Sequence, residues 1–292
     1  MALSEADLVA ATIGREGPRR TKVIRPVAFS FRDLWAGLLG LSAYSDLLVV
    51  LSAHRLKVRY KQSMLGIAWA VIQPLALMII YTLVFSVFTR IKTPGVPYPV
   101  FAYAALLPWT FFSTSLTNAT NGLVSHAQLV TKVYFPREIL PISYIVAALV
   151  DLLIASIVMT GLMVYYHVGL TPQVLWLVPV TLVMAAFTTS CSLIFSAMQV
   201  RVRDIGMAMP LVLQLWMFAS PVVYPLRQVP ERLRDYYLLN PMVGIIENFR
   251  AALLGNPLDV HSLTISIVVS VVLLPLSYLY FKRVEATVAD VI

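Results

Sequence analysis

Residues 142–166 read ISYIVAALVDLLIASIVMTGLMVYY and contain one charged side chain, Asp151. A helix that crosses the hydrocarbon core of a bilayer needs about 20 mainly apolar residues, at a rise of about 1.5 Å each. This segment therefore predicts a membrane-spanning helix. The whole chain of 292 residues has the same character, with 59% hydrophobic residues, 12% charged residues and a mean hydropathy of +0.82. Soluble domains carry roughly 25% charged residues, so the composition excludes a soluble globular fold.

Five other apolar segments are also long enough to cross a bilayer. They are residues 66–88, 99–117, 174–198, 205–226 and 263–281. We therefore predict an all-α membrane protein with six transmembrane helices, in a domain that covers residues 66–285. Residues 1–30 are predicted to be a flexible cytoplasmic tail, residues 31–65 an interfacial amphipathic region, and residues 286–292 a short C-terminal tail.

The distribution of positive charge indicates the orientation in the membrane. Ten Lys and Arg residues precede residue 66, and six more follow the second, fourth and sixth spans, out of 22 in the chain. Because Lys and Arg are retained on the cytoplasmic side, we predict that both termini are cytoplasmic. The net charge of +8 then reflects topology, and no basic face interleaved with base-stacking aromatics indicates a nucleic-acid partner.

Several kinds of active site have no counterpart in the sequence. Cys191 is the only cysteine, so an internal disulfide or a cysteine-based metal cluster is excluded. The motifs G-x-x-x-x-G-K-[ST], H-E-x-x-H and G-x-S-x-G do not occur. We expect no catalytic site, metal or cofactor in this chain. Energy for any uphill transport must come from an ion gradient or from another subunit.

A basic segment precedes the first span. Residues 44–62 combine Leu47, Leu48 and Leu51, which share one side of a helix, with a basic end. Its cations are Arg55, Lys57, Arg59 and Lys61. One interpretation is an interfacial helix whose cations bind anionic lipid headgroups. A second, compatible interpretation is that the same cations also meet the anionic headgroup of a substrate that enters from the cytoplasmic leaflet.

Two loops have unusual sequences. The cytoplasmic connector between the second and third spans contains KVYFPREILP, from Lys132 to Pro141. Its aromatic residues either pack against the bundle or form a docking surface for a soluble partner. The loop between the fifth and sixth spans contains two short apolar pieces interrupted by Pro and Gly, which predict re-entrant or interfacial helices on the outer side. Irregular backbone at that depth is tolerated where protein or water covers it, which suggests a cavity.

Asp151 is an ionisable residue in the middle of a predicted span. Because such residues are costly in lipid, they indicate a functional role. Burial against neighbouring polar groups is the alternative. Ion coupling is less favoured, because the spans offer no His or Lys partner for a proton relay.

Several segments together resemble a known family. Residues 59–69 (RYKQSMLGIAW), followed by Gln73-Pro74-Leu75, resemble the start of the first span in ABC exporter permeases for cell-surface polysaccharides, the group of O-antigen (Wzm-like), capsule and teichoic-acid exporters. The connector KVYFPREILP resembles their coupling segment, and Arg203-Asp204-Ile205 is similar to the start of their fifth span. SPVVYP (220–225), NP (240–241) and ENFR (247–250) resemble their outer hairpin. The resemblance covers about residues 30–285 in order.

The resemblance implies a transport subunit of the bacterial cytoplasmic (inner) membrane that forms a homodimer and binds two separate ATPase subunits. ATP and Mg²⁺ would bind to those subunits, and the cargo would be a lipid-linked, O-antigen-like polysaccharide. The residues implied in ATPase coupling are Lys132, Tyr134, Phe135, Pro136, Arg137 and Glu138. The cations Arg55, Lys57, Arg59 and Lys61 would meet the diphosphate of the lipid carrier.

Aromatic side chains suit a sugar path, because the CH-rich faces of sugars stack on rings without one fixed set of hydrogen bonds. Candidates to line such a path are Tyr81, Phe85, Tyr103, Trp109, Phe112, Trp216, Phe218 and Tyr224. Interfacial belts of Trp and Tyr and lipid-facing Phe are the alternative explanation for these residues.

Two other functions remain open at this stage. An ABC permease for another lipid or a drug would share most of these features. A different class, an ion-coupled carrier or a membrane glycosyltransferase, is less favoured. The sequence has no internal repeat of the kind that carriers show, and the acidic residues of the long outer loop are interspersed with arginines rather than clustered.

Overall fold

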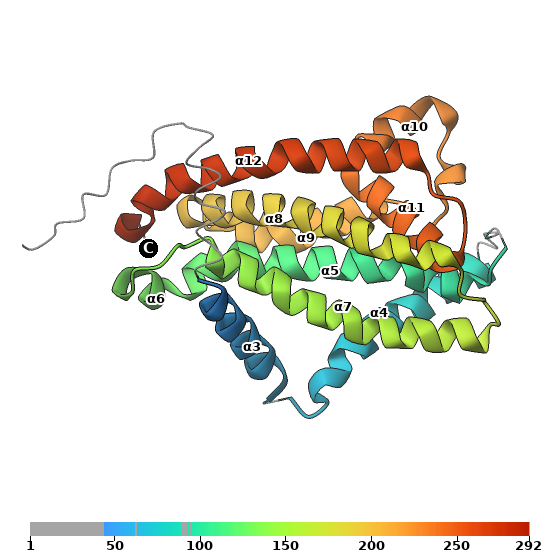
Figure 1. Ribbon diagram of the computed structural model, residues 1–292, viewed down its shortest axis with the longest axis horizontal. Helices are drawn as coiled ribbons and strands as arrows, with labels where there is room; N and C mark the ends of the chain where they lie inside the picture. Colours follow the sequence, from blue (N-terminus) through green and yellow to red (C-terminus); the bar gives the residue numbers. More distant parts are fainter. Residues whose placement is uncertain (1–43, 62, 89–92, 94, 292) are drawn as a thin grey trace, which may run out of the picture.

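The computed structural model describes residues 44–61, 63–88, 93 and 95–291, and this part of the chain is helical without strands (Figure 1). The expected tail 1–30 lies outside the described residues, and the division of the chain at residues 30, 65 and 285 stays a prediction. The expected all-α membrane fold is confirmed. Five described helices are long and apolar enough to cross a membrane.

The five long helices form one bundle. They are α4 (Trp69–Tyr81), which begins after the 3-10 turn η2 (Gly66–Ala68) and continues into the π-helical turn η3 (Thr82–Phe88), α5 (Tyr98–Ser125), α7 (Ile139–Tyr165), α8 (Leu177–Arg201), preceded by η4 (Pro172–Trp176), and α12 (Val260–Val291). Most of α5 is buried, because α4, α7 and α8 all pack against it. The remaining long helix, α12, packs along α8.

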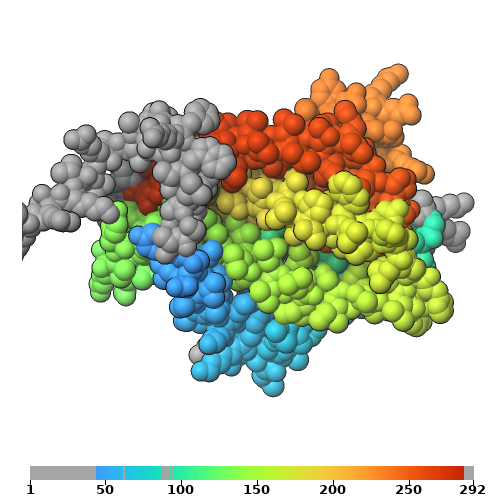
Figure 2. Space-filling view, viewed as in Figure 1, coloured from blue at the N-terminus to red at the C-terminus, as the bar shows by residue number. Residues whose placement is uncertain are grey.

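The two ends of the bundle differ. The short helix α6 (Ala127–Lys132), the start of α7 and the C-terminal end of α12 lie at one end, which we call the α6 end (Figure 1). The short helices η5 (Leu226–Gln228), α10 (Glu231–Leu238) and α11 (Pro241–Leu254) lie toward the other end, which we call the α10 end. Between the ends, α7, α8 and α12 form much of the face in Figure 2. These helices expose large apolar side chains such as Leu153, Leu182 and Val271, as a lipid-facing surface requires.

The predicted fifth span, residues 205–226, is only partly helical. Helix α9 (Asp204–Phe218) ends at Phe218, and its 15 residues reach about 22 Å, short of the roughly 30 Å hydrocarbon core. Irregular backbone completes the segment. Two contacts hold the segment 205–226. Near its start, the side chain of Gln199 in α8 accepts a hydrogen bond from the amide of Gly206 (2.6 Å). Near its end, the hydroxyl of Tyr98 in α5 donates to the carbonyl of Val223 (2.6 Å).

The hairpin between α9 and α12 contains the two short helices that the sequence predicts. The exposed α10 is followed by α11, which is mostly buried against α5, α8 and α12. Asn240 caps α11 by accepting from the amide of Met242 (3.1 Å), and Gly255 ends the helix at a φ of +71°, which favours glycine. The hairpin therefore inserts one of its helices into the bundle.

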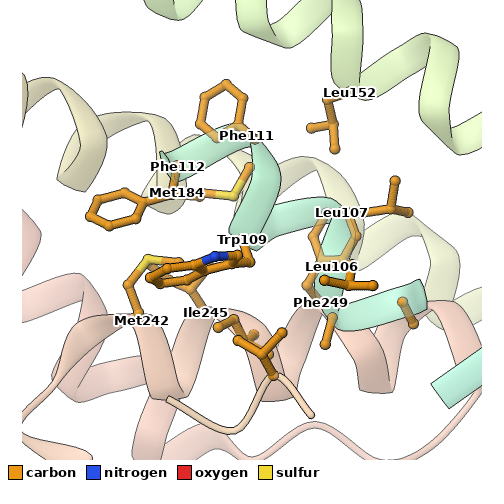
Figure 3. Close-up of a cluster of buried hydrophobic side chains, with 14 of the residues drawn as sticks. Leu106, Leu107, Trp109, Phe111, Phe112, Leu152, Met184, Met242, Ile245 and Phe249 are labelled. Atoms are coloured by element: carbon orange, nitrogen blue, oxygen red, sulfur yellow. The ribbon is translucent and has the colours of Figure 1, made fainter. Parts of the chain in front are cut away.

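The main core forms where α11 meets the long helices. Figure 3 shows Leu106, Leu107, Trp109, Phe111 and Phe112 of α5 beside Leu152 of α7, Met184 of α8, and Met242, Ile245 and Phe249 of α11. A second cluster, at the α6 end, contains Phe135, Ile139, Leu193 and Phe281. Helix α3 (Ser45–Lys61) packs Leu47, Leu48 and Leu51 against this second cluster. The leucines of the predicted interfacial helix thus contact protein.

Candidate functional site

The connector before α7 divides into an exposed and an anchored part. Lys132 is exposed, and Val133 and Tyr134 are 52% and 72% exposed, whereas Phe135 is 7% exposed and belongs to the second cluster. The sequence left open whether Tyr134 and Phe135 pack against the bundle or form a docking surface. In the structure, Phe135 packs inside the bundle and Tyr134 faces outward. Pro136 precedes the helix, which begins at Ile139. A partner at this surface would therefore contact Lys132, Val133 and Tyr134.

The last two residues of the expected coupling set bind the C-terminal part of α12. Glu138, which is 1% exposed, accepts from Lys282 Nζ (2.8 Å) and from the Tyr278 hydroxyl (3.2 Å). Lys282 also pairs with Glu285 (2.8 Å). Arg137 donates from its amide to Glu285 Oε1 (3.1 Å) and from Nη1 to the Glu285 carbonyl (2.6 Å). These contacts link the connector to α12.

Two of the four cations on α3 are bound to α7. Arg55 donates from Nε to the Ser143 hydroxyl (2.7 Å), and its guanidinium carbon lies 3.3 Å from the centroid of the Tyr144 ring. Arg59 Nη1 lies 2.5 Å from Asp151 Oδ2. Lys57 and Lys61 are exposed. The expected headgroup set therefore contains two exposed lysines and two arginines that hold α3 on α7.

Asp151 has two partners from α3. Besides Arg59, the Tyr60 hydroxyl donates to Asp151 Oδ1 (2.6 Å), and burial followed by this hydrogen bond raises the pKa of Tyr60 to about 12. Sequence reasoning looked for a partner among His and Lys of the spans and missed these residues, which lie about 90 positions earlier, outside the spans. The available sequence signal for this pairing was that Arg59 and Tyr60 begin the family-like segment RYKQSMLG.

A pocket adjoins this ion pair. It has a volume of about 130 Å³ and lies between the end of α3 and helices α4, α5 and α7. We call it the Asp151 pocket. The polar and aromatic residues that line it are Arg59, Tyr60, Trp69, Gln73, Thr110, Phe111, Thr114 and Asp151. The Thr110 hydroxyl is buried and has no hydrogen-bond partner among the described residues.

The expected path-lining aromatics occupy different environments. Tyr103, Trp109 and Phe112 are buried in the main core, where the Tyr103 hydroxyl donates to the Ala155 carbonyl (3.0 Å) and Phe112 stacks on Phe187. In this chain these three rings are enclosed by their own core. Whether they line a path stays a prediction.

The other five candidates lie nearer the surface. Tyr81, Phe85, Trp216 and Tyr224 are half-buried, and Phe218 is 48% exposed. Trp216 packs edge-on against Phe112. The hydroxyl of Tyr81 contacts the Met217 sulfur (3.4 Å), which places it beside α9.

Arg250 organises the irregular backbone that follows α9. Its buried guanidinium donates to the carbonyls of Pro221 (2.6 Å), Val222 (3.2 Å) and Phe101 (3.3 Å) and to Glu247 (2.7 Å). Buried carbonyls outside a helix need such donors, since water does not reach them. Sequence reasoning listed the ENFR and SPVVYP segments separately, and the structure brings them into direct contact.

Asn240 supports the same backbone from the other side. Its Nδ2 donates to the Ala219 carbonyl (3.1 Å) and to the Ser220 hydroxyl (2.9 Å), while its Oδ1 accepts from the Trp216 indole (3.0 Å). Tyr224 hydrogen-bonds to Tyr237 of α10 and to the Phe218 carbonyl (2.6 Å). Together with Arg250, these contacts fix the three segments of the expected outer hairpin as one unit.

Comparison with known proteins gives a consistent result. The model of the ABC-2 type transporter family matches residues 46–254. The chain is 30% identical over 251 residues to an O-antigen export system permease protein RfbA of Klebsiella pneumoniae, which covers 85% of this chain and 95% of the relative. It is 36% identical over 234 residues to the protein of the same name from Myxococcus xanthus (79% and 89%). It is 26% identical over 209 residues to the polysialic acid transport protein KpsM of Escherichia coli (69% and 78%).

Proposed function

Because the chain belongs to the ABC-2 type transporter family, we propose that it is the membrane-spanning subunit of an ABC exporter that moves a lipid-linked cell-surface polysaccharide, similar to O-antigen, across the bacterial inner membrane. The observation that carries this proposal is the extent of the similarity. It includes 95% of the length of an O-antigen export permease, so it covers the transport domain rather than a shared fragment.

A separate ATPase is the proposed source of energy, with ATP and Mg²⁺ bound to that subunit. The exposed connector residues Lys132, Val133 and Tyr134 offer a docking surface at the α6 end. The bonds from Arg137 and Glu138 to α12 support it, because a force applied at this surface would move α7 and α12 together.

We assign the α6 end to the cytoplasm. Lys132, Arg201, Arg203 and Lys282 lie in the elements that meet there, as the positive-inside rule expects of a cytoplasmic face. The exposed Lys57 and Lys61 of α3 then lie near the inner leaflet, where they are suited to attract the diphosphate of a lipid carrier.

A homodimer is the proposed assembly. Helix α9 exposes Met207 (85%), Leu211 (61%) and Leu215 (63%), and it contacts the rest of the bundle mainly through α5 and α8. A second copy on this face would cover these side chains and would add an apolar neighbour to a helix that is too short to span alone.

The test is copurification of the tagged chain from cells that express its whole gene cluster, followed by an ATPase assay. We expect a stoichiometric ABC ATPase and vanadate-sensitive hydrolysis. Tyr134→Ala should weaken retention of the ATPase, whereas Tyr165→Ala, which removes a ring of similar exposure (75%) at the other end of α7, should not. A monodisperse chain without ATPase or hydrolysis would refute the proposal, and export of a drug or simple lipid in place of a glycan would change its cargo.

A further inference from the structure

The Asp151 pocket combines polar groups with aromatic rings between the end of α3 and helices α4, α5 and α7. Asp151 lies 12 residues after the start of α7, about 18 Å along the helix. Polar side chains within an apolar span are costly unless they are paired or face a functional cavity. Arg59, Tyr60 and Asp151 satisfy one another. The Thr110 hydroxyl is buried away from the pocket, but the exposed Gln73 and the half-buried Thr114 add polar side chains to its wall. The pocket therefore offers hydrogen-bonding groups to a ligand.

The charge of the pocket excludes an anionic headgroup as its best ligand. The guanidinium of Arg59 and the carboxylate of Asp151 are in direct contact, so their charges cancel, and the carboxylate would repel a diphosphate. The remaining polar groups are the exposed amide of Gln73 and the hydroxyl of Thr114. These groups both donate and accept, as a ligand rich in neutral hydroxyls requires.

The rings and the size of the pocket agree with such a ligand. Trp69, Tyr60 and Phe111 contribute aromatic surface to its wall, and CH-rich sugar faces pack on rings of this kind. Its volume of about 130 Å³ is close to that of an engineered cavity of about 150 Å³ that binds a benzene ring, so a single ring fits better than an extended chain. A site with buried polar groups also selects for hydroxyl-bearing ligands, because other molecules leave those groups unpaired.

We propose that the Asp151 pocket binds one neutral sugar unit of the transported glycan. This inference rests on the proposed function for its biological ligand, but binding itself needs no ATPase. The pocket would hold a sugar beside α4 while Lys57 and Lys61 remain accessible to the lipid carrier. Arg59 and Tyr60 then position Asp151 for hydroxyl groups of the sugar, in place of a role in binding the diphosphate.

The experiment measures protection of a thiol in the pocket. Cys191→Ala removes the only native cysteine, and Ala70→Cys places a thiol on the pocket wall. The full chain is placed in lipid nanodiscs and labelled with a membrane-permeant maleimide, in the presence of hexyl glucoside or hexylphosphocholine below their micellar concentrations. Ala76→Cys, on the same helix but outside the pocket, is the matched control.

We expect hexyl glucoside to slow labelling of Ala70→Cys about threefold when it is present at about twice its Kd, since the free fraction falls as 1/(1 + [L]/Kd). Hexylphosphocholine should have no such effect, and Ala76→Cys should respond to neither compound. Adding Thr114→Val should reduce the protection, because it removes a hydroxyl from the pocket wall and keeps the side-chain volume.

Equal protection by both compounds would overturn the proposal in favour of a site for an alkyl chain, and the absence of protection would also overturn it. The result is separable from the proposed function. Protection by hexyl glucoside without a copurifying ATPase would refute the proposed exporter function and support the sugar site. An active exporter without such protection would support the exporter function and refute the sugar site. In an active exporter, Thr114→Val should lower glycan export with unchanged ATPase assembly.

Discussion

Replacing Arg250 by methionine removes the donor that three buried carbonyls and one carboxylate share. The side chain of Arg250 is 4% exposed, and its guanidinium carbon also lies 3.8 Å from the centroid of the Phe101 ring. Methionine fills much of the same volume but donates no hydrogen bond. The carbonyls of Pro221 and Val222 would then be left in a site that water reaches poorly, while Glu247, 23% exposed, would regain solvent.

The magnitude follows from the number of groups left unpaired. A buried acceptor without a donor costs about 1–3 kcal/mol, and two or three such carbonyls give a loss of about 3–5 kcal/mol. Loss of the ion pair adds little to this sum, because the carboxylate of Glu247 is partly exposed and regains solvent. For a chain of this size, 1 kcal/mol corresponds to roughly 2–4 °C in Tm. We therefore expect Arg250→Met to lower Tm by about 10 °C.

The assay uses the single cysteine. Cys191 is buried (5% exposed), so a thiol-reactive fluorescent dye reports its exposure as the purified protein unfolds in detergent at a fixed heating rate. Arg232→Met, at an exposed position of the same loop, is the matched control and should change Tm little. Arg250→Lys should lie between the two. A Tm for Arg250→Met within about 2 °C of the control would refute the reasoning that Arg250 holds the irregular backbone.

Three further predictions concern other contacts of the bundle. Gly244→Ala should lower Tm by several degrees, because a Cβ there would lie 2.3 Å from the Ser262 carbonyl oxygen and would push α11 away from α12. An unchanged Tm would contradict this close approach. Burial, together with nearby cations, lowers the pKa of His126. Its stabilising contribution is therefore present above the unfolded value of about 6.5 and is lost as the pH falls from that value through the lower pKa of the folded state. The fall in Tm from pH 7.5 to 5.5 should therefore be smaller in His126→Gln, and an equal fall would show that His126 does not contribute. Lys282→Met should lower the free energy of unfolding by about 3–5 kcal/mol, because it leaves the buried Glu138 without its cation. In a double-mutant cycle, adding Glu138→Gln should restore part of this loss, and strictly additive losses would exclude the coupling.

The long helices could be predicted because their cause is local. Partition into a bilayer depends on the sum of apolar residues along one contiguous segment, so the run at 142–166 is sufficient to predict a span, and the structure places α7 at Ile139–Tyr165. The two short hairpin helices were predictable for a similar reason, since Pro and Gly limit their length. The end of α9 was missed because hydropathy stays high through residues 219–226, although Pro221 and Pro225 disfavour a helix there. What the sequence does not contain is the set of partners, Arg250 and Asn240, that bind the carbonyls of this irregular segment.

The sequence by itself determined the class of molecule, its membrane helices and the segments shared with its family, since each depends on residues that are neighbours in the chain. Only the tertiary structure decided how the functional candidates pair. Asp151 meets Arg59 and Tyr60 from a helix outside the spans, Glu138 meets Lys282 from the last helix, and Phe135 is buried while Tyr134 beside it is exposed. The physical reason is that a charge or a ring is satisfied by whichever side chain the packed helices bring within contact distance. Hydropathy along the chain carries no information about that partner.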